Sequence, residues 1–279
     1  MIKEIKKITK QNLDLKNLEE NQLSIQLSLD GFSFCIYNSN YKIINAFAHF
    51  EFENVNTPYK HLELVENLFK QEPLLQAKFK NVNVTHFNNL VTQVPLPFFN
   101  KDNLGDYLKY SVKVLENDYL VYDQISNSEI VNVYIPFVNI NNFLIDKFGA
   151  FNYKHSSTVL IETLLNKYKN FEKEIMFVNV TNLNFEIVVL KKNKLELYNS
   201  FSFKTKEDFI YYILFVAEQL NLNPEEFQLL LLGDIEKESE LYAIAFQYVR
   251  NIDFYKEHST IKIIENVSPH SYFTLLNQF

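Results

Sequence analysis

The chain has 279 residues, enough for one or two domains with a large buried core. Apolar residues make up 47% of it and aromatic residues 15%, which excludes a disordered chain. The net charge is −7 and Arg250 is the single arginine, so direct binding to nucleic acid is not expected. No apolar run is long enough to span a bilayer, and the basic start lacks the apolar part of a signal peptide. Cys35 is the single cysteine, which excludes an internal disulfide, and a cytoplasmic protein is expected.

The first half of the chain is predicted to mix strands with helices. Residues 1–20 form a short helix or the lead-in to a strand. Asp30-Gly31 is typical of a type I′ hairpin turn, in which both residues have positive φ. Thr57 and Pro58 are typical of the cap and first residue of a helix that ends near residue 71. Strands are predicted at 23–29, 32–38, 42–50, 82–87, 90–94, 118–125 and 129–136, and further helices at 103–114 and 139–148.

The second half is predicted to repeat that order. A helix at 156–170, capped by Ser156 or Ser157, leads into it, and Thr205 begins a later helix. The continuous apolar run 227–232 predicts a strand that is buried on both faces. The other strands are predicted at 174–180, 184–190, 194–203 and 252–254, and the other helices at 236–249 and from Ser268-Pro269 onward.

Two stretches of the chain match each other at a constant offset of 153 residues. Ile25 then falls on Val178, and the same offset gives the pairs Leu27/Val180, Phe32/Phe185, Phe34/Ile187, Ile36/Val189, Ile44/Leu197 and Phe50/Phe203. Each copy predicts three strands followed by a helix, which favours an α/β fold. We expect two lobes, 1–155 and 156–279, with a cleft between them and with the last helix packed back on the first lobe.

This repeated unit resembles the lobe of the actin-like ATPase (ribonuclease H-like) fold. The sequences LSIQLSLDGFSF at 23–34, LVTQVPLPFF at 90–99 and FVNVTNLNFEIVVL at 177–190 are similar to those of DUF3822, a family of uncharacterised proteins from Bacteroidetes. The resemblance covers nearly the whole chain. It implies a two-lobed actin-like fold with duplicated βββαβα units and a degenerate cleft, and it implies no known activity.

The residues that bind nucleotide in working actin-like ATPases are replaced in this chain. Resemblance places Gln26 at the aspartate that organises Mg²⁺, and it places neutral or bulky residues where glycines hold the phosphates. The candidate, degenerate cofactor-binding positions are Gln26, Ser28, Asp30, Asn179, Thr181, Asn182, Asn184, Glu186, Gly233 and Asp234. Neither GxGxxG nor GxxxxGK[ST] occurs in a chain with four glycines. We therefore predict no ATP hydrolysis and no catalytic residue, and we expect neither ATP nor Mg²⁺, although nucleotide binding stays open.

Simpler roles are predicted for most of these residues. Asp30 is interpreted as a turn residue and Glu186 as a solvent-facing strand residue. Leu183 and Phe185 are expected to add bulk at the second phosphate turn. The six histidines lack metal-ligand spacing and are expected to be partly exposed, whereas Cys35 is expected to be a core thiol.

Three functional hypotheses follow. The first is a non-catalytic actin-like protein that binds another protein or itself, and some of the 26 Phe and 17 Tyr residues would serve as contact surface. For that surface the sequence offers Phe98-Phe99, Tyr211-Tyr212, Tyr119, Tyr122 and Tyr134. The second is an atypical nucleotide-binding switch that uses the cleft. The third, implied by the resemblance alone, is a role accessory to ribosomal-RNA modification, because family members are encoded beside an rRNA methyltransferase.

Overall fold

The computed structural model describes residues 1–9, 13, 18–182, 184–256, 261–264 and 267–279, and it divides into two compact units. Unit 1 comprises Met1–Leu160, Thr260–Asn266 and Thr274–Phe279, and unit 2 comprises Ile161–Ser259 and Val267–Phe273. The chain therefore passes between the units inside helix α4 (Ser156–Lys167), and its last six residues belong to unit 1. Among the described residues, no helix has the length and apolar character that crossing a membrane requires.

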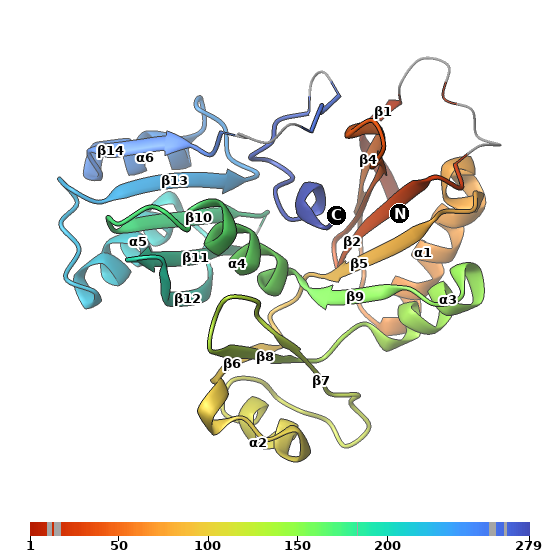
Figure 1. The fold of residues 1–279 in the computed structure, drawn as a ribbon, viewed down its shortest axis with the longest axis horizontal. Helices are drawn as coiled ribbons and strands as arrows, with labels where there is room; N and C mark the ends of the chain where they lie inside the picture. Colours follow the sequence, from red (N-terminus) through yellow and green to blue (C-terminus); the bar gives the residue numbers. More distant parts are fainter. Residues whose placement is uncertain (10–12, 14–17, 183, 257–260, 265–266) are drawn as a thin grey trace. The chain divides into compact units, whose positions relative to one another are not determined.

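Unit 1 is built on a sheet whose strands lie in the order β1-β4-β3-β2-β5-β9 (Figure 1). These strands are β1 (Ile2–Thr9), β2 (Asn21–Ser28), β3 (Gly31–Asn38), β4 (Ile43–Phe52), β5 (Asn81–His86) and β9 (Asn152–His155). A smaller sheet holds β6 (Val91–Pro95), β8 (Ile130–Tyr134) and β7 (Val121–Gln124), in that order. The helices are α1 (Pro58–Gln71), α2 (Leu104–Leu108) and α3 (Val138–Phe148), with 3₁₀ turns η1 (Pro73–Gln76), η2 (Leu96–Phe98), η3 (Lys101–Asn103) and η4 (Leu275–Asn277).

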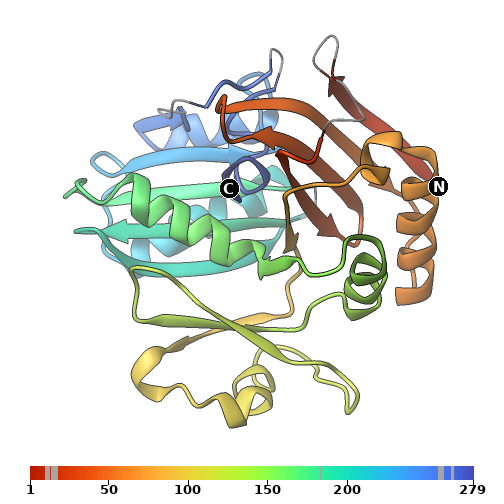
Figure 2. The same cartoon turned by 45° about the vertical axis from the view of Figure 1, so that its right-hand side comes forward.

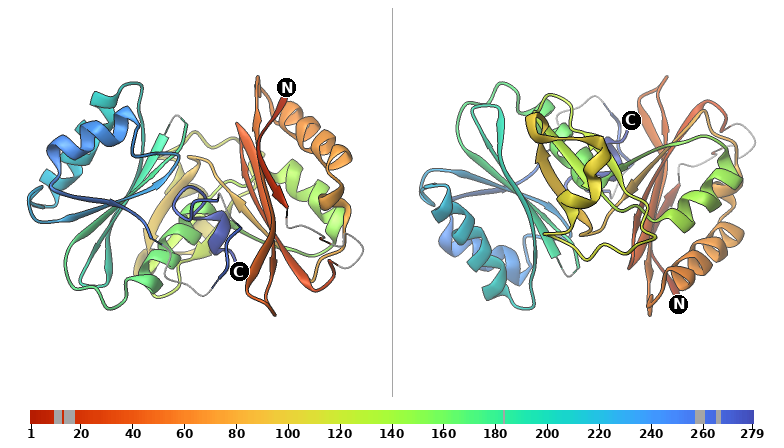
Figure 3. Two further views of the ribbon diagram at one scale, coloured as in Figure 1. Left: turned by 90° about the horizontal axis from the view of Figure 1, so that it is seen from above. Right: turned by 90° about the horizontal axis from the view of Figure 1, so that it is seen from below.

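Alternation along the strands separates the two faces of the larger sheet. Ile25, Phe34 and Val84 point to the apolar core that the sheet shares with α1 and α3. Their neighbours in sequence, among them Gln26 and Cys35, point to the opposite face. Figure 3 shows α1 and α3 on one side of this sheet and the end of the chain on the other.

Unit 2 is built on a sheet in the order β12-β11-β10-β13-β14. Its strands are β10 (Ile175–Val180), β11 (Asn184–Lys191), β12 (Lys194–Ser202), β13 (Gln228–Gly233) and β14 (Asn251–Phe254). Helices α5 (Lys206–Gln219) and α6 (Glu240–Tyr248) supply apolar residues to the core on one face of the sheet. In Figure 2, α4 runs across the opposite face.

The predicted duplication is confirmed in its first hairpin. Ile25 pairs with Phe34 across β2 and β3, and Val178 pairs with Ile187 across β10 and β11, so the offset of 153 preserves the register. In both units the first strand of this hairpin also pairs in parallel with the strand that follows the helix: β2 pairs with β5 in unit 1, and β10 pairs with β13 in unit 2.

The constant offset is wrong for the third strand. Phe32 pairs with Phe50, whereas Phe185 pairs with Phe201 and not with Phe203. In the same way Ile44 corresponds to Leu195 and not to Leu197, because Tyr37 pairs with Ile44 and Leu190 pairs with Leu195. The second copy has a tighter connection here, since β11 and β12 are joined by Lys192 and Asn193, both with positive φ.

Several predicted elements have different bounds or types. The start of the chain is strand β1, the helix predicted at 103–114 is only α2, and α6 begins at Glu240 behind its cap Ser239. The helix predicted from Ser268 is instead a series of turns that ends in η4. Strand β9 has only four residues at the edge of its sheet, which is too short for a periodic signal.

Candidate functional site

The three predicted positions of unit 1 lie along the β2–β3 hairpin. Gln26 is on β2, on the face opposite the apolar core, and its Oε1 accepts a 2.6 Å hydrogen bond from the Thr274 hydroxyl. Ser28 ends the strand, and its hydroxyl donates to the carbonyl of Gly31 at 3.3 Å. Asp30 is exposed in the turn. Gln26 is therefore the one of these residues whose side chain is engaged by a distant part of the chain.

The turn between β2 and β3 is not the predicted type I′ turn. Strand β2 ends at Ser28 and pairs with Gly31, so the two turn residues are Leu29 and Asp30. Neither has positive φ. Gly31 is needed for space instead, because a Cβ atom at that position would lie 3.0 Å from the carbonyl oxygen of Phe50 on β4.

Residues 274–279, hereafter the docked segment, lie on the face of β2, β3 and β5 that is opposite the apolar core (Figure 3). Thr274, Leu275 and Leu276 are buried there. The thiol of Cys35 lies 3.8 Å from the carbonyl oxygen of Leu275, at hydrogen-bond distance for sulfur. Burial raises the pKa of this thiol, so it stays protonated and can donate.

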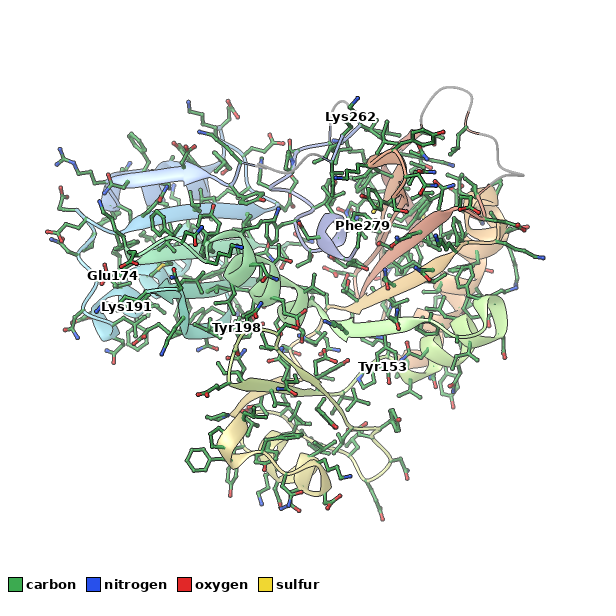
Figure 4. All side chains as sticks on the ribbon, viewed as in Figure 1. Tyr153, Glu174, Lys191, Tyr198, Lys262 and Phe279 are labelled. Atoms are coloured by element: carbon green, nitrogen blue, oxygen red, sulfur yellow. The ribbon has the colours of Figure 1, made fainter. Side chains whose placement is uncertain are left out.

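The end of the docked segment is held by amide groups. The Gln278 Nε2 donates to the Thr85 hydroxyl oxygen at 2.9 Å and to the Ile25 carbonyl at 3.3 Å. The Asn83 Nδ2 donates to the Gln278 carbonyl at 3.1 Å. The ring of Phe279, labelled in Figure 4, stacks on Tyr37 with centroids 4.1 Å apart. We call the side chains of Gln26, Cys35, Tyr37, Asn83 and Thr85 the receptor face.

In unit 2, Glu186 is not the solvent-facing residue that alternation predicted, since its exposed fraction is 2%. Its carboxylate accepts 2.8 Å and 2.7 Å hydrogen bonds from the Asn179 amide and the Tyr198 hydroxyl. Burial raises the pKa of Glu186, and these two donors oppose the shift. The alternation correctly placed Glu186 on the face of β11 opposite Phe185 and Ile187, but the residues on both faces of this strand are buried.

The remaining predicted residues of unit 2 lie at the ends of β10, β11 and β13. The Thr181 hydroxyl and amide both donate to the Asn184 carbonyl at 2.8 Å, so these two residues close the turn. Asn182 is exposed, and Leu183 lies outside the described residues. Phe185 is not bulk in the turn as expected, because it is fully buried in the core of unit 2.

Gly233 ends β13 with φ of +82° beside Val180. Its amide donates to the His270 carbonyl at 2.7 Å, and the Asp234 amide donates to the Val180 carbonyl at 2.8 Å. The Asp234 side chain is exposed. The structure thus brings Asn179 to Glu186, Thr181 to Asn184 and Gly233 to the end of β10, all within unit 2.

A buried polar network that the sequence did not predict lies where α4 begins in unit 1. Asn132 on β8 donates both amide hydrogens, to the Ser157 hydroxyl at 3.0 Å and to the Thr158 hydroxyl at 2.7 Å. The Thr158 hydroxyl donates to Asp123 at 2.8 Å, and the Asp123 carboxylate also accepts from the His155 amide at 2.8 Å. These bonds fasten the smaller sheet to the start of α4. Only the polar residues in 155–158 could have indicated them.

His155, and not a serine, caps α4. Its Nε2 lies 3.0 Å from the Asn88 carbonyl, which can only accept, so Nε2 carries the proton. Its Nδ1 then accepts from the Ser157 hydroxyl at 2.7 Å and from the Ser157 amide at 3.1 Å. Both ring nitrogens of His155 are thus used in hydrogen bonds within the protein, so the contact between His155 and Ser157 is structural.

The expectation of partly exposed histidines is wrong for His61, His86 and His155, which are all buried. Burial lowers the pKa of His155 from 6.5 to about 4, and it lowers the pKa values of His61 and His86 to about 4 and about 3. Each folded-state pKa lies below the unfolded value, so the stability from the neutral ring is present above pH ~6.5 and is lost as the pH falls toward the folded pKa.

We expect His155→Gln to weaken this acid sensitivity. With pKa values of 6.5 unfolded and about 4 folded, His155 alone lowers the free energy of unfolding by about 2 kcal/mol between pH 7 and pH 5. Urea denaturation at both pH values should show a smaller difference for the variant than for the parent chain. The raised pKa values of Asp123 and Glu186 act in the opposite direction in both proteins. His155 also contributes to the lowered pKa of His86, so its replacement weakens the acid sensitivity through both rings. Equal pH dependence in the two proteins would contradict the assignment.

No group of three or more His, Cys, Asp or Glu residues that could hold a metal ion is found in the described part of the chain. The Gln26 amide, which the resemblance places at the Mg²⁺-organising position, accepts a hydrogen bond from Thr274. This part of unit 1 packs against residues 274–279 of the chain itself, through both side chains and backbone.

Comparison with solved structures defines the class. A Bacteroides thetaiotaomicron protein with an actin-like ATPase fold and unknown function is similar over 95% of this chain and 98% of its own, with 24% identity and a TM-score of 0.78. The structure described as the PilM-PilN type IV pilus biogenesis complex is similar over 91% of this chain and 96% of its own, with 11% identity and a TM-score of 0.62. The protein has the actin-like ATPase fold.

The family follows from the sequence. The model of the family described as protein of unknown function (DUF3822) matches residues 10–252, and the chain belongs to this family. No curated protein sequence matches it. The fold class and the family predicted from the sequence are both confirmed.

Proposed function

We propose that the protein is a non-catalytic actin-like protein that acts by binding other proteins or further copies of itself. The observation that carries this proposal is the contact between Gln26 and Thr274. A residue at the position of the metal-organising aspartate takes part in holding a peptide segment, so this sheet face serves recognition of polypeptide.

The chemistry of the second candidate position supports the same function. Asn179 and Glu186 hydrogen-bond to each other, and Tyr198 occupies the other carboxylate oxygen of Glu186. Each oxygen of this buried carboxylate is engaged by a side chain of unit 2, which supports a structural role for Glu186. Direct nucleic-acid binding is not part of the proposal, because the chain is acidic and has one arginine.

Exposed aromatic rings and one structural neighbour also support a binding role. Phe98, Tyr119, Tyr122 and Tyr211 are exposed, as expected for contact residues, whereas Tyr134 is fully buried and is excluded from that set. The neighbour in the PilM-PilN complex has the same fold within an assembly of proteins. We extend that mode of action to this chain as part of the proposal, together with a cytoplasmic location.

We expect no thermal stabilisation by ATP, ADP or GTP with Mg²⁺. A ligand at 100 times its Kd stabilises the folded state by about 2.7 kcal/mol. Nucleotide at ~1 mM would therefore give a shift of this size for a Kd of about 10 µM, and a larger shift for tighter binding. Differential scanning fluorimetry should show an unchanged Tm, and a phosphate-release assay should show no turnover. The matched control is Gln26→Leu, which removes the amide that the resemblance places at the Mg²⁺-organising position.

A rise in Tm that Gln26→Leu abolishes would contradict the proposal and would favour the nucleotide switch. The protein-binding side is tested separately, by light scattering of the purified chain and by affinity capture with the chain as bait. A strictly monomeric chain that captures no partner in stoichiometric amount would count against it.

A further inference from the structure

The docked segment and the receptor face together form a built peptide-binding site. The segment Thr-Leu-Leu-Asn-Gln-Phe contributes two buried leucines, and its Thr274 hydroxyl, Gln278 amide and Phe279 ring contact Gln26 on β2, Thr85 on β5 and Tyr37 on β3. The face also holds the segment's backbone, through Asn83 on the Gln278 carbonyl and Cys35 on the Leu275 carbonyl. In peptide recognition, main-chain hydrogen bonds give affinity and side-chain contacts give specificity, and this face offers both.

The docked segment follows directly on a stretch of the chain that belongs to the other unit. Val267–Phe273 belong to unit 2, and residues 274–279 belong to unit 1. Lys262 is held separately on unit 1, where it pairs with Ile43 of β4. The contacts with the receptor face therefore decide only which copy's face residues 274–279 occupy. Exchange of an identical element between copies needs no new interface, because every contact of the exchanged state already exists in the single molecule.

We propose that the receptor face binds residues 274–279 of a second copy of this chain, so that the protein self-associates by exchanging the docked segment. This inference rests on the proposed function and names its partner. A second copy is the favoured occupant because the receptor face is complementary to a sequence that every copy carries. Within one molecule, the covalent link gives the docked segment an effective concentration of order millimolar at its own receptor face. Binding of a second copy's segment has to compete with this intramolecular binding.

A complementation experiment weakens that competition. The tail variant carries Gln278→Ala and Phe279→Ala, which leaves its receptor face intact and weakens the docking of its own segment. The face variant carries Gln26→Leu and Asn83→Ala, which leaves its segment intact and weakens the docking on its own face. Only in the mixture can an intact segment meet an intact face, and it must do so between molecules.

We expect the mixture to form a heterodimer that associates at least ~10-fold more tightly than either variant with itself, because each variant lacks about two of the contacts and a tenfold change corresponds to ~1.4 kcal/mol. Sedimentation velocity at 1–100 µM with one variant labelled at its amino terminus measures this directly. A mixture that sediments as the sum of two monomers would overturn the proposal. That result would leave the nucleotide test of the proposed function untouched.

A synthetic peptide with the sequence of residues 271–279, SYFTLLNQF, gives an independent readout. By fluorescence anisotropy it should bind the tail variant and bind the face variant at least ~10-fold more weakly. Equal binding to both variants, or to neither, would overturn the proposal. Should the face variant lose its circular dichroism spectrum, Gln26→Leu alone replaces it, with an expected ~3-fold loss for one hydrogen bond.

Discussion

Replacing Gly233 by alanine is expected to unfold unit 2 or to destabilise it by more than about 4 kcal/mol. A Cβ atom at this position would lie 1.9 Å from the carbonyl oxygen of Val180 and 2.7 Å from its nitrogen. Both are backbone atoms of β10, in the middle of the sheet, so neither can move without breaking the pairing with β11 and β13. The φ of +82° adds backbone strain for any residue with a side chain.

Gly149 provides the matched control. It also has a positive φ, +73°, but nothing lies within 4 Å of a Cβ atom placed there. Gly149→Ala should therefore cost only the backbone strain, about 1–3 kcal/mol. Urea denaturation followed by circular dichroism compares the two, and hydrogen exchange at β10 and β13 amides reports unit 2. Equal effects of the two substitutions would show that close approach is not the reason for Gly233.

Phe185→Ala is expected to cost about 3–5 kcal/mol, the range for removing a fully buried phenylalanine from a core. Phe185 is fully buried, and its ring packs at 4.9 Å from Phe209 and 5.6 Å from Phe201 between ring centroids. The variant leaves a cavity between β11, β12 and α5. The measurement is the free energy of unfolding in urea.

Tyr248 on α6 is the control for this substitution. Its side chain is exposed, so Tyr248→Ala should change stability by no more than about 0.5 kcal/mol. If Phe185→Ala were as mild as this control, Phe185 would be free to serve the neighbouring turn, as its position in the sequence first indicated. A large loss would confirm that it belongs to the core.

Local sequence signals predicted those elements whose formation depends on nearby residues. Thr57 and Thr205 cap α1 and α5 as predicted, because a hydroxyl at the cap bonds an amide three residues on. The run at 227–232 forms a strand buried on both faces, since a strand covered by helices on either side has no polar face. The match of Ile25 to Val178 likewise survives in the register of both sheets.

Features that depend on contacts between residues far apart in the sequence could not be predicted from local patterns. Period-two alternation assigned Glu186 to the correct face but could not show that Tyr198 and Asn179 cover it. The histidine at position 155 looks like any other polar residue before a helix, and only its contacts with Asn88 and Ser157 make it a neutral, buried cap.

The sequence by itself therefore determined the class of fold, because that rests on residue types in consecutive strands and turns. From the resemblance it also predicted that Gln26 stands where a carboxylate would be needed, and that prediction stays open. Only the tertiary structure decided what Gln26 does instead, since its partner Thr274 is separated from it by 248 residues. Contacts over such separations leave no periodic trace in the sequence, because they depend on how the folded chain returns to its first sheet.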